Sequence, residues 1–175
     1  MGDNRDKSKD SRFDNIVGYV PYENDLDPWL SLRENILFNA ELYKVSTDIA
    51  SKRIEKFSRL LDFRNQLDRT AHKVSGGIHK KTMIVRGLVQ NPDILILDEP
   101  TAGINPTLIN GIIDRLIKVN NDFGITLLVI EHNMRVIMQL AQQIFCLAHG
   151  QLIANGTPDE IKNDQRVIDA YLGVQ

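Results

Sequence analysis

The spacing of hydrophobic and polar residues changes along this chain and divides it into segments of different secondary structure. Residues 13–20 form a short apolar run that predicts a β-strand. Apolar residues then recur at helical spacing over 31–69, and Ser31 with Glu34 matches a capping box that starts a helix. A second helix of this block is expected to begin at 46–47.

After residue 77 the pattern alternates between short apolar runs and helical periodicity. We expect strands at 94–97, 125–130, 144–147 and 152–154, and helices at 78–89, 107–119, 134–142, 158–162 and 167–172. Such alternation is typical of βαβ units and predicts an α/β fold with a mainly parallel sheet. The helical block that precedes it would then be a subdomain inserted into that sheet.

An acidic pair, Asp98 and Glu99, follows four aliphatic residues at 94–97. Such an aliphatic run predicts a fully buried strand, and in open α/β sheets ligands bind beyond the carboxyl ends of the parallel strands. Two carboxylates at that place can bind Mg²⁺ and orient a water molecule, as nucleotide hydrolysis requires. The alternative is a buried strand followed by an ordinary polar turn.

A second candidate site precedes the helix predicted at 78–89. Ser75, Gly76 and Gly77 lie at its amino end, where backbone N–H groups and small residues favour the binding of a phosphate group. The alternative is that Ser75 is an ordinary N-cap after a glycine turn.

The composition narrows the classes of protein to which the chain can belong. It has 175 residues, 42% hydrophobic and 25% charged, as expected for one globular domain with a sizeable core. A formal net charge of −2 gives no reason to expect a nucleic acid partner. The longest apolar run, 125–130, is too short to span a bilayer, so no direct membrane insertion is expected. The single cysteine, Cys146, lies in an apolar run and is expected in the core of a protein from the reducing cytosol.

Four short motifs occur in a fixed order and resemble those of the ABC ATPase nucleotide-binding domain. They are the signature motif at 74–77, Walker B at 94–100, the D-loop at 101–106 and the switch histidine at 129–132. The resemblance extends from residue 15 to residue 173 and implies a P-loop NTPase-like (RecA-like) α/β fold, present in part, with an inserted α-helical subdomain. It divides the chain into a charged arm (1–12) and a partial ABC ATPase domain (13–175), composed of the Q-loop region (13–30), the helical subdomain with the signature motif (31–77) and the C-terminal core (78–175).

The same resemblance implies a role for each candidate site residue. Asp98 would bind Mg²⁺ through a coordinated water, and Glu99 would polarise the water that attacks ATP. The loop at 75–77 would contact the γ-phosphate of ATP held by the opposite subunit. His132 would hydrogen-bond the γ-phosphate, although a lone histidine at a strand end is otherwise structural. Asn105 lies in the loop that crosses the dimer interface in this family.

Two departures from the family pattern concern the phosphate site. Tyr22 stands where the family has the Q-loop glutamine, which contacts Mg²⁺ and moves with the membrane partner, and a phenol is a poor Mg²⁺ ligand. The P-loop, G-x-x-x-x-G-K-[ST], occurs nowhere in the sequence, although it cradles the β- and γ-phosphates in this family. We therefore expect negligible ATP hydrolysis by this chain alone.

The two ends of the chain resemble different families. Segments at 131–134, 156–161 and 170–173, together with Asn105, resemble the branched-chain amino-acid importer branch of the ABC ATPases. Residues 2–12 resemble the last conserved box of type I signal peptidases, whose Ser/Lys catalytic dyad is not in this chain. The alternative for these residues is a charged, disordered arm that matches by chance.

The resemblance as a whole implies an ATP-binding and hydrolysing fragment of an ABC transporter subunit, with amino acids as the candidate substrates. Its cofactors would be ATP and Mg²⁺, and its partners a second ABC ATPase subunit and transmembrane permease subunits. Through these partners it would lie in the cytoplasm, on the inner face of the cell membrane. Two alternatives stay open: a non-catalytic interaction module that keeps the signature and dimer surfaces, and a signal-peptidase remnant.

Overall fold

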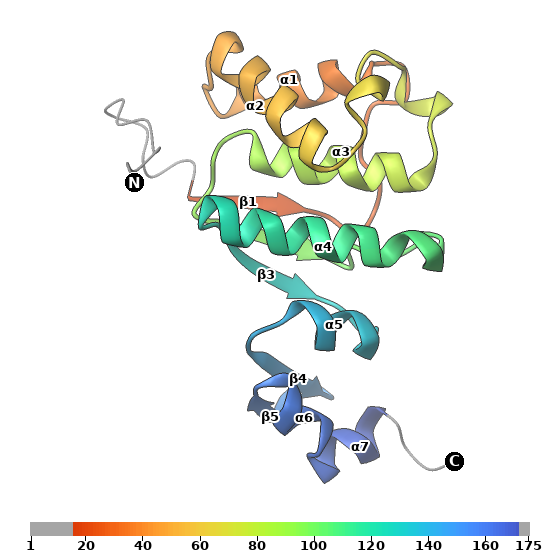
Figure 1. Ribbon diagram of the computed structural model, residues 1–175, viewed down its shortest axis with the longest axis vertical. Helices are drawn as coiled ribbons and strands as arrows, with labels where there is room; N and C mark the ends of the chain where they lie inside the picture. The colour runs from red at the N-terminus through yellow and green to blue at the C-terminus, as the bar shows by residue number, and fades with distance from the viewer. Residues whose placement is uncertain (1–15, 172–175) are drawn as a thin grey trace. The chain divides into compact units, whose positions relative to one another are not determined.

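A computed structural model describes residues 16–171, and the chain divides into two compact units after residue 130. Figure 1 shows the elements of both units, coloured from the amino to the carboxyl end. The first unit contains the elements up to Ile130, and the second those from Glu131 onward. The predictions for the charged arm at 1–12, including its signal-peptidase-like box, lie outside the described residues.

The first unit contains a three-stranded sheet in the order β1–β2–β3. Its strands are β1 (Val17–Val20), β2 (Ile94–Asp98) and β3 (Thr126–Ile130). Both pairings are parallel, as the alternation of strands and helices predicts, and Asp98 lies opposite Ile130. The carboxyl ends of β2 and β3 therefore meet at one edge of the sheet.

The two faces of this sheet differ in burial, most clearly along β2. Leu95 and Leu97 have no exposed surface, whereas Ile94 and Ile96 on the other face of β2 are only half-buried. The prediction of a fully buried strand is therefore wrong for that face. Side chains alternate between the two faces of a strand, and the second face is accessible to solvent. Its most exposed apolar members keep between 42% and 53% of their surface accessible: Val17, Tyr19, Leu128 and Ile130.

Two helices begin the helical block between β1 and β2, and the first of them has a side-chain cap. α1 (Leu32–Leu42) starts with the predicted capping box, because the Ser31 hydroxyl accepts from the Glu34 N–H at 3.1 Å and the Glu34 carboxylate accepts from the Ser31 N–H at 2.7 Å. α2 (Thr47–Leu60) starts after Ser46, as the sequence predicts. Two short 3₁₀ helices continue the chain, η1 (Arg64–Gln66) and η2 (Ala71–Lys73).

Helix α3 (Gly76–Leu88) packs closely against β1. The approach is possible because two glycines face each other. A Cβ atom on Gly18 would lie 2.4 Å from the carbonyl oxygen of Gly87, and a Cβ atom on Gly87 would lie 2.8 Å from Leu95 Cδ1. Only hydrogen fits at these two positions without displacement of neighbours. This contact fixes α3, and the loop that begins it, relative to the sheet.

Helix α4 (Pro106–Phe123) connects β2 to β3. It ends at Gly124, whose φ of 66° lies in the left-handed region that favours glycine. Near this end the Phe123 ring contacts that of Phe57 in α2, with centroids 5.2 Å apart. The helix is therefore anchored on the helical block, and it extends beyond the predicted end at residue 119 up to the glycine that stops it.

The second unit consists of an antiparallel hairpin and three short helices within its described range. The hairpin pairs β4 (Ile144–Ala148) with β5 (Gln151–Gly156), and the helices are α5 (Met134–Leu140), α6 (Pro158–Lys162) and α7 (Gln165–Tyr171). Cys146 belongs to the core of this unit, as predicted, and desolvation raises the pKa of its thiol. The other buried core residues are Ile144, Ala154, Ile161 and Val167.

The helices predicted after residue 77 are all present, with ends that differ from the prediction by a few residues. Helix α6 has the predicted ends and a second capping box, formed by Thr157 and Glu160. Over the described range 16–171, none of the helices combines the length and the apolar character needed to cross a lipid bilayer.

Candidate nucleotide site

The two candidate catalytic carboxylates lie at the carboxyl end of β2. Asp98 is the last residue of the strand, and both Asp98 and Glu99 are half-buried. Glu99 has a φ of 44°, in the left-handed region, and its N–H donates to the carbonyl oxygen of Ile130 at 2.9 Å. A residue other than glycine is strained in this conformation, and such strain concentrates at functional sites. The hydrogen bond to β3 therefore fixes the backbone of Glu99 against its local preference.

Tyr19 reaches the same edge of the sheet from β1. Its hydroxyl donates to Asp98 Oδ2 at 3.3 Å. Desolvation and the charge of Asp98 raise the pKa of Tyr19 above its ordinary value, so the phenol keeps its proton and stays a donor. Sequence reasoning missed Tyr19, because its position depends on the register between β1 and β2: Tyr19 lies opposite Ile96, which shares a face with Asp98.

Tyr22, which stands at the position of the Q-loop glutamine, lies in the loop after β1 and is 54% exposed. Its backbone carbonyl oxygen accepts a hydrogen bond from Lys80 Nζ at 3.0 Å, and the carbonyl oxygen of Pro21 accepts from the same atom at 3.3 Å. Lys80 belongs to α3 and is buried, with only 6% of its surface exposed. The loop backbone is thus held by α3, while the phenol of Tyr22 is accessible to solvent.

Two further contacts join this loop to α3. Asn24 Nδ2 lies 3.1 Å from Nδ1 of His79, and the guanidinium of Arg86 forms an ion pair with Asp25. His79 Nε2 also lies 2.6 Å from the carbonyl oxygen of Ala71. His79, which belongs to none of the sequence motifs, therefore joins the loop after β1 to the segment that precedes α3.

The signature loop at 75–77 begins helix α3. Ser75 is the N-cap residue by position, but its side chain makes no capping hydrogen bond, and the first turn of the helix has no acidic residue. A Cβ atom on Gly76 would lie 3.8 Å from the Gly103 carbonyl oxygen, and one on Gly77 would lie 3.9 Å from Leu108 Cδ1. The structure therefore places the signature loop beside the D-loop and the start of α4. An amino end of this kind favours an anion.

Asn105 has a local structural role in the D-loop. It is the N-cap residue of α4, and its Oδ1 accepts hydrogen bonds from the N–H of Thr107 at 3.0 Å and from the Thr107 hydroxyl at 2.9 Å. Gly103 of the same loop has a φ of 69° and is exposed. The cap fixes the point at which the D-loop ends and α4 begins.

His132 belongs to the second unit, in the short segment between β3 and α5, and its side chain is exposed. Its neighbours shape this segment. Asn133 is the N-cap of α5, with Oδ1 accepting from the Arg135 N–H at 3.1 Å, and the Glu131 carboxylate accepts from the Asn133 N–H at 3.2 Å. The histidine is therefore presented by a segment with its own local hydrogen bonds.

The chemistry of Asp98 and Glu99 suits Mg²⁺ bound together with a nucleotide. Among residues 16–171, no group of three or more His, Cys, Asp or Glu side chains could hold a metal ion by itself. Mg²⁺ is commonly bound through one or two carboxylates, while waters and substrate phosphates complete its shell. A pair of carboxylates at the carboxyl edge of a parallel sheet fits that arrangement.

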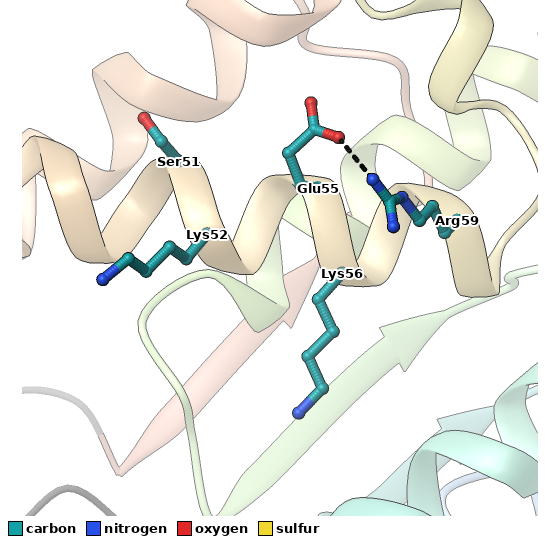
Figure 2. A pocket seen from close by; sticks show the side chains of 5 residues that line it. All are labelled: Ser51, Lys52, Glu55, Lys56 and Arg59. Atoms are coloured by element: carbon teal, nitrogen blue, oxygen red, sulfur yellow. Dashed lines mark ion pairs between the residues drawn. The ribbon is translucent and has the colours of Figure 1, made fainter.

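A hollow of about 550 Å³ on the surface of α2 is not part of this site. Figure 2 shows that its lining residues all come from that one helix: Ser51, Lys52, Glu55, Lys56 and Arg59. Glu55 pairs with Arg59 and also with Arg33 and Arg64. The hydrogen bond from Arg64 is the main reason that the pKa of Glu55 is lowered. Because the central carboxylate is already used by three arginines, we assign this hollow no ligand.

Two family descriptions match the chain. ABC transporter matches residues 2–102, which is more than half of the chain and includes the signature loop and the acidic pair. Branched-chain amino acid ATP-binding cassette transporter matches residues 151–175, from β5 onward.

Several curated proteins are similar over most of this chain. The methionine import ATP-binding protein MetN 1 of Bacillus cereus is 34% identical over 152 residues, which cover 86% of this chain and 44% of that protein. The lipopolysaccharide export system ATP-binding protein LptB of Haemophilus influenzae is 32% identical over 162 residues, 91% of this chain and 66% of that protein. The chain thus spans about half the length of the curated relatives it matches.

A solved structure shares the fold. It is cbiO1 from Clostridium perfringens, part of the ABC transporter complex cbiONQ, with a TM-score of 0.77 and 28% sequence identity over 88% of this chain and 62% of that chain. This match confirms the predicted P-loop NTPase-like α/β fold. The matching family description, the curated relatives and this structure agree, and the chain belongs to the ABC transporter ATP-binding family.

Proposed function

We propose that this chain is the part of an ABC transporter subunit that supplies the Walker B carboxylates and the signature loop for ATP hydrolysis. The observation that carries the proposal is the position of Asp98 and Glu99 at the carboxyl edge of a parallel sheet, where nucleotides bind in α/β folds. The same unit presents an uncapped helix amino end at 75–77. Relatives named as ATP-binding proteins of import and export systems support this assignment.

Each residue has a part that follows from its chemistry. Asp98 would hold Mg²⁺, which when bound neutralises charge on the phosphates, and Tyr19 orients that carboxylate through its hydrogen bond. Glu99 would accept a hydrogen bond from the attacking water, with its backbone fixed by β3. His132 would hydrogen-bond the γ-phosphate. Tyr22, with an exposed phenol, would not replace the metal contact of the family glutamine.

The signature loop would act on a nucleotide held by the opposite subunit. N–H groups at the first turn of α3 favour phosphate, and Asn105 fixes the neighbouring D-loop by capping α4. The partners of the chain would therefore be a second ABC ATPase subunit and transmembrane permease subunits, which would place it on the cytoplasmic face of the membrane. The match of residues 151–175 to the branched-chain amino-acid family favours amino acids as the transported substrates.

A non-catalytic interaction module is the second candidate. The observation that favours it is the absence of a P-loop from the printed sequence, combined with preserved signature and D-loop surfaces. Such a module would add its signature loop to a nucleotide held by a partner, without hydrolysing ATP at its own carboxylates.

Association with a P-loop-containing ABC ATPase subunit tests the proposal. We expect a heterodimer in the presence of Mg²⁺ and ATP, measured by analytical ultracentrifugation, and none without nucleotide. Gly77→Asp should abolish it, because the carboxylate would meet the γ-phosphate. Asn121→Asp adds a similar charge at an exposed position of α4 and should leave association unchanged.

The Glu99→Gln variant separates the two candidates. If the chain contributes catalysis, the heterodimer formed with wild-type chain should hydrolyse ATP faster than the one formed with Glu99→Gln. Equal rates would favour the non-catalytic module. Association that does not depend on ATP, or that survives Gly77→Asp, would show that the loop at 75–77 is only a helix start.

A further inference from the structure

Asp62 follows helix α2 in a backbone conformation that is uncommon for a residue other than glycine. Its φ of 56° lies in the left-handed region, which glycine favours at the end of a helix. The Asp62 N–H donates to the carbonyl oxygen of Arg59 at 3.1 Å. The next N–H, that of Phe63, donates to the carbonyl oxygen of Ser58 at 3.0 Å. These two bonds form a Schellman motif, so the backbone of Asp62 ends α2.

Two other helices end in the same backbone conformation without a carboxylate. Helix α1 ends at Lys44, whose φ is 55°, with the same pair of hydrogen bonds, and α4 ends at Gly124, whose φ is 66°. Three residues of different chemistry therefore fit this position. The ending of α2 does not by itself explain the carboxylate of Asp62, and residues held in strained conformations concentrate at functional sites.

Side chains from two other helices converge on Asp62. From α3, the ammonium group of Lys81 donates to the Asp62 carbonyl oxygen at 3.3 Å. From α4, Arg115 Nη2 donates to Asp62 Oδ2 at 3.2 Å, while Nη1 donates to the carbonyl oxygen of Gly111, one turn earlier. One residue at the end of α2 thus contacts both the helix that begins with the signature loop and the helix that follows the D-loop.

The two basic side chains lie close enough to repel each other. Burial, and next the charge of Arg115, lower the pKa of Lys81, whereas the charge of Asp62 acts in the opposite direction. The Asp62 side chain is 80% exposed, and an exposed ion pair by itself contributes little. Because this carboxylate faces two cations at once, it also offsets the repulsion between a cation of α3 and a cation of α4.

We propose that Asp62 is a positioning residue for the signature loop, and this rests on the proposed function. Its carboxylate offsets the repulsion between Lys81 and Arg115 and so keeps α3 and α4 together. The two loops approach closely, since a Cβ atom on Gly76 would lie 3.8 Å from the carbonyl oxygen of Gly103. A separation of the helices would move the amino end of α3, which favours phosphate, relative to the D-loop.

Hydrogen exchange of the full chain, without nucleotide or partner, tests this role. The Ile78 N–H donates to the Ser75 carbonyl oxygen at 2.9 Å and reports on the first turn of α3. The Leu108 N–H donates to the Asn105 carbonyl oxygen at 2.8 Å and reports on the first turn of α4. Asp62→Asn removes the charge and keeps a residue that tolerates positive φ. We expect both amides to exchange about two- to fivefold faster at low salt, while the amides of β4, in the second unit, stay unchanged.

Three controls separate the charge of Asp62 from its local structure. Asp122→Asn removes an exposed carboxylate from α4 and should exchange like the wild type. At about 1 M salt, where charges are screened beyond about 3 Å, the difference between Asp62→Asn and the wild type should largely disappear. Adding Arg115→Gln to Asp62→Asn removes one of the two like charges and should restore slow exchange.

Equal exchange by Asp62→Asn and the wild type would overturn the proposal. So would faster exchange that persists at high salt or in the double variant, because Asp62 would then act only through the ending of α2. Association is measured next, with a P-loop-containing ABC ATPase subunit and Mg²⁺-ATP, and Asp62→Asn should associate about two- to fivefold more weakly than the wild type.

Association as tight as that of the wild type, in spite of faster exchange, would overturn the positioning role. A wild-type chain that fails to associate, while Asp62→Asn changes the exchange as expected, would refute the proposed function instead. The exchange result would in that case still support Asp62 as the residue that holds α3 and α4 together.

Discussion

Replacing Gly18 with alanine tests whether the contact between β1 and α3 positions the signature loop. The added Cβ would lie 2.4 Å from the carbonyl oxygen of Gly87, 2.9 Å from Leu95 Cδ1 and 3.1 Å from Pro92 Cγ. A backbone oxygen cannot rotate away as a flexible side chain can. Helix α3 and strand β1 must therefore separate.

The size of the effect follows from these distances. Carbon and oxygen atoms normally approach to about 3.3 Å, so the helix must move by roughly 1 Å. Overpacking of this kind costs about 1–3 kcal/mol, and the reduced freedom of the unfolded chain returns about 0.4–1 kcal/mol. We expect Gly18→Ala to lower the free energy of unfolding by about 1.3 kcal/mol, the difference between the midpoints of these two ranges.

Gly111→Ala is the matched control. Gly111 lies inside α4, and its added Cβ would meet only the far end of the Arg115 side chain, at 2.8 Å from Nη1. That side chain can move, and alanine is favoured over glycine in a helix by about 0.5–1 kcal/mol. We therefore expect the same substitution to be neutral or stabilising here.

Urea unfolding followed by tryptophan fluorescence measures both variants. Trp29 is the single tryptophan and lies in the first unit, which contains both glycines. It is 77% exposed, so the signal comes from its contact with the His72 ring, 5.2 Å away, which is lost when this unit unfolds. The midpoints should differ while the slopes stay equal. If Gly18→Ala proves as stable as Gly111→Ala, the close approach of α3 to β1 is not what positions the helix.

Three other predictions follow from the described contacts. Glu55→Gln should lower the free energy of unfolding by about 1 kcal/mol at neutral pH. The pKa of Glu55 is lowered, chiefly by the hydrogen bond from Arg64, so the difference between the variant and the wild type should persist above about pH 4.3 and vanish in acid. Urea titrations at several pH values measure it. Lys80→Met should leave two carbonyl oxygens of the loop after β1 without their buried donor, cost about 1–3 kcal/mol and speed hydrogen exchange in that loop. Asp98→Asn should lower the pKa of Tyr19, because the charge of Asp98 contributes to raising it. An ultraviolet titration, with Tyr19→Phe subtracted as the reference, measures this pKa. An unchanged pKa would contradict the contact.

Local sequence signals predicted the starts of several elements. The capping box at Ser31 occurs as expected, because it depends on residues three positions apart in the sequence. The helix after Ser46 also starts where expected, although the Ser46 side chain makes no capping hydrogen bond. The ends were predicted less well. Helix α4 continues to Phe123, where Gly124 stops it, and this depends on an exposed last turn that has no strong apolar period.

Contacts between distant segments could not be predicted in the same way. The hydrogen bond from Tyr19 to Asp98 joins residues 79 positions apart, and it depends on the register between β1 and β2. The aliphatic run at 94–97 suggested burial on both faces, but the number of covered faces depends on which other elements are present. A strand of apolar residues therefore predicts the sheet and not its covering layers.

The contacts in the first unit connect the acidic pair to the signature loop through one continuous structure. Tyr19 holds Asp98 from β1, the neighbouring Gly18 packs on α3, and α3 begins with the loop at 75–77. A displacement of β1 should therefore move both the Asp98 carboxylate and the start of α3. Under the proposed function, this connection links the two groups that would act on phosphate.

The acidic pair and the signature loop would not by themselves bind ATP tightly. Millimolar affinity for ATP requires about 4 kcal/mol of binding free energy, whereas a phosphate at a helix amino end contributes about 0.3–2 kcal/mol. Asp98 and Glu99 repel phosphates unless Mg²⁺ lies between them, so they cannot make up the difference. Under the proposed function, a contribution of this size from the signature loop would add to the affinity for a nucleotide that another subunit already holds. Under the proposed function, the phosphate cradle would therefore come from the subunit that holds the nucleotide, and this chain would add its carboxylates and its signature loop to it.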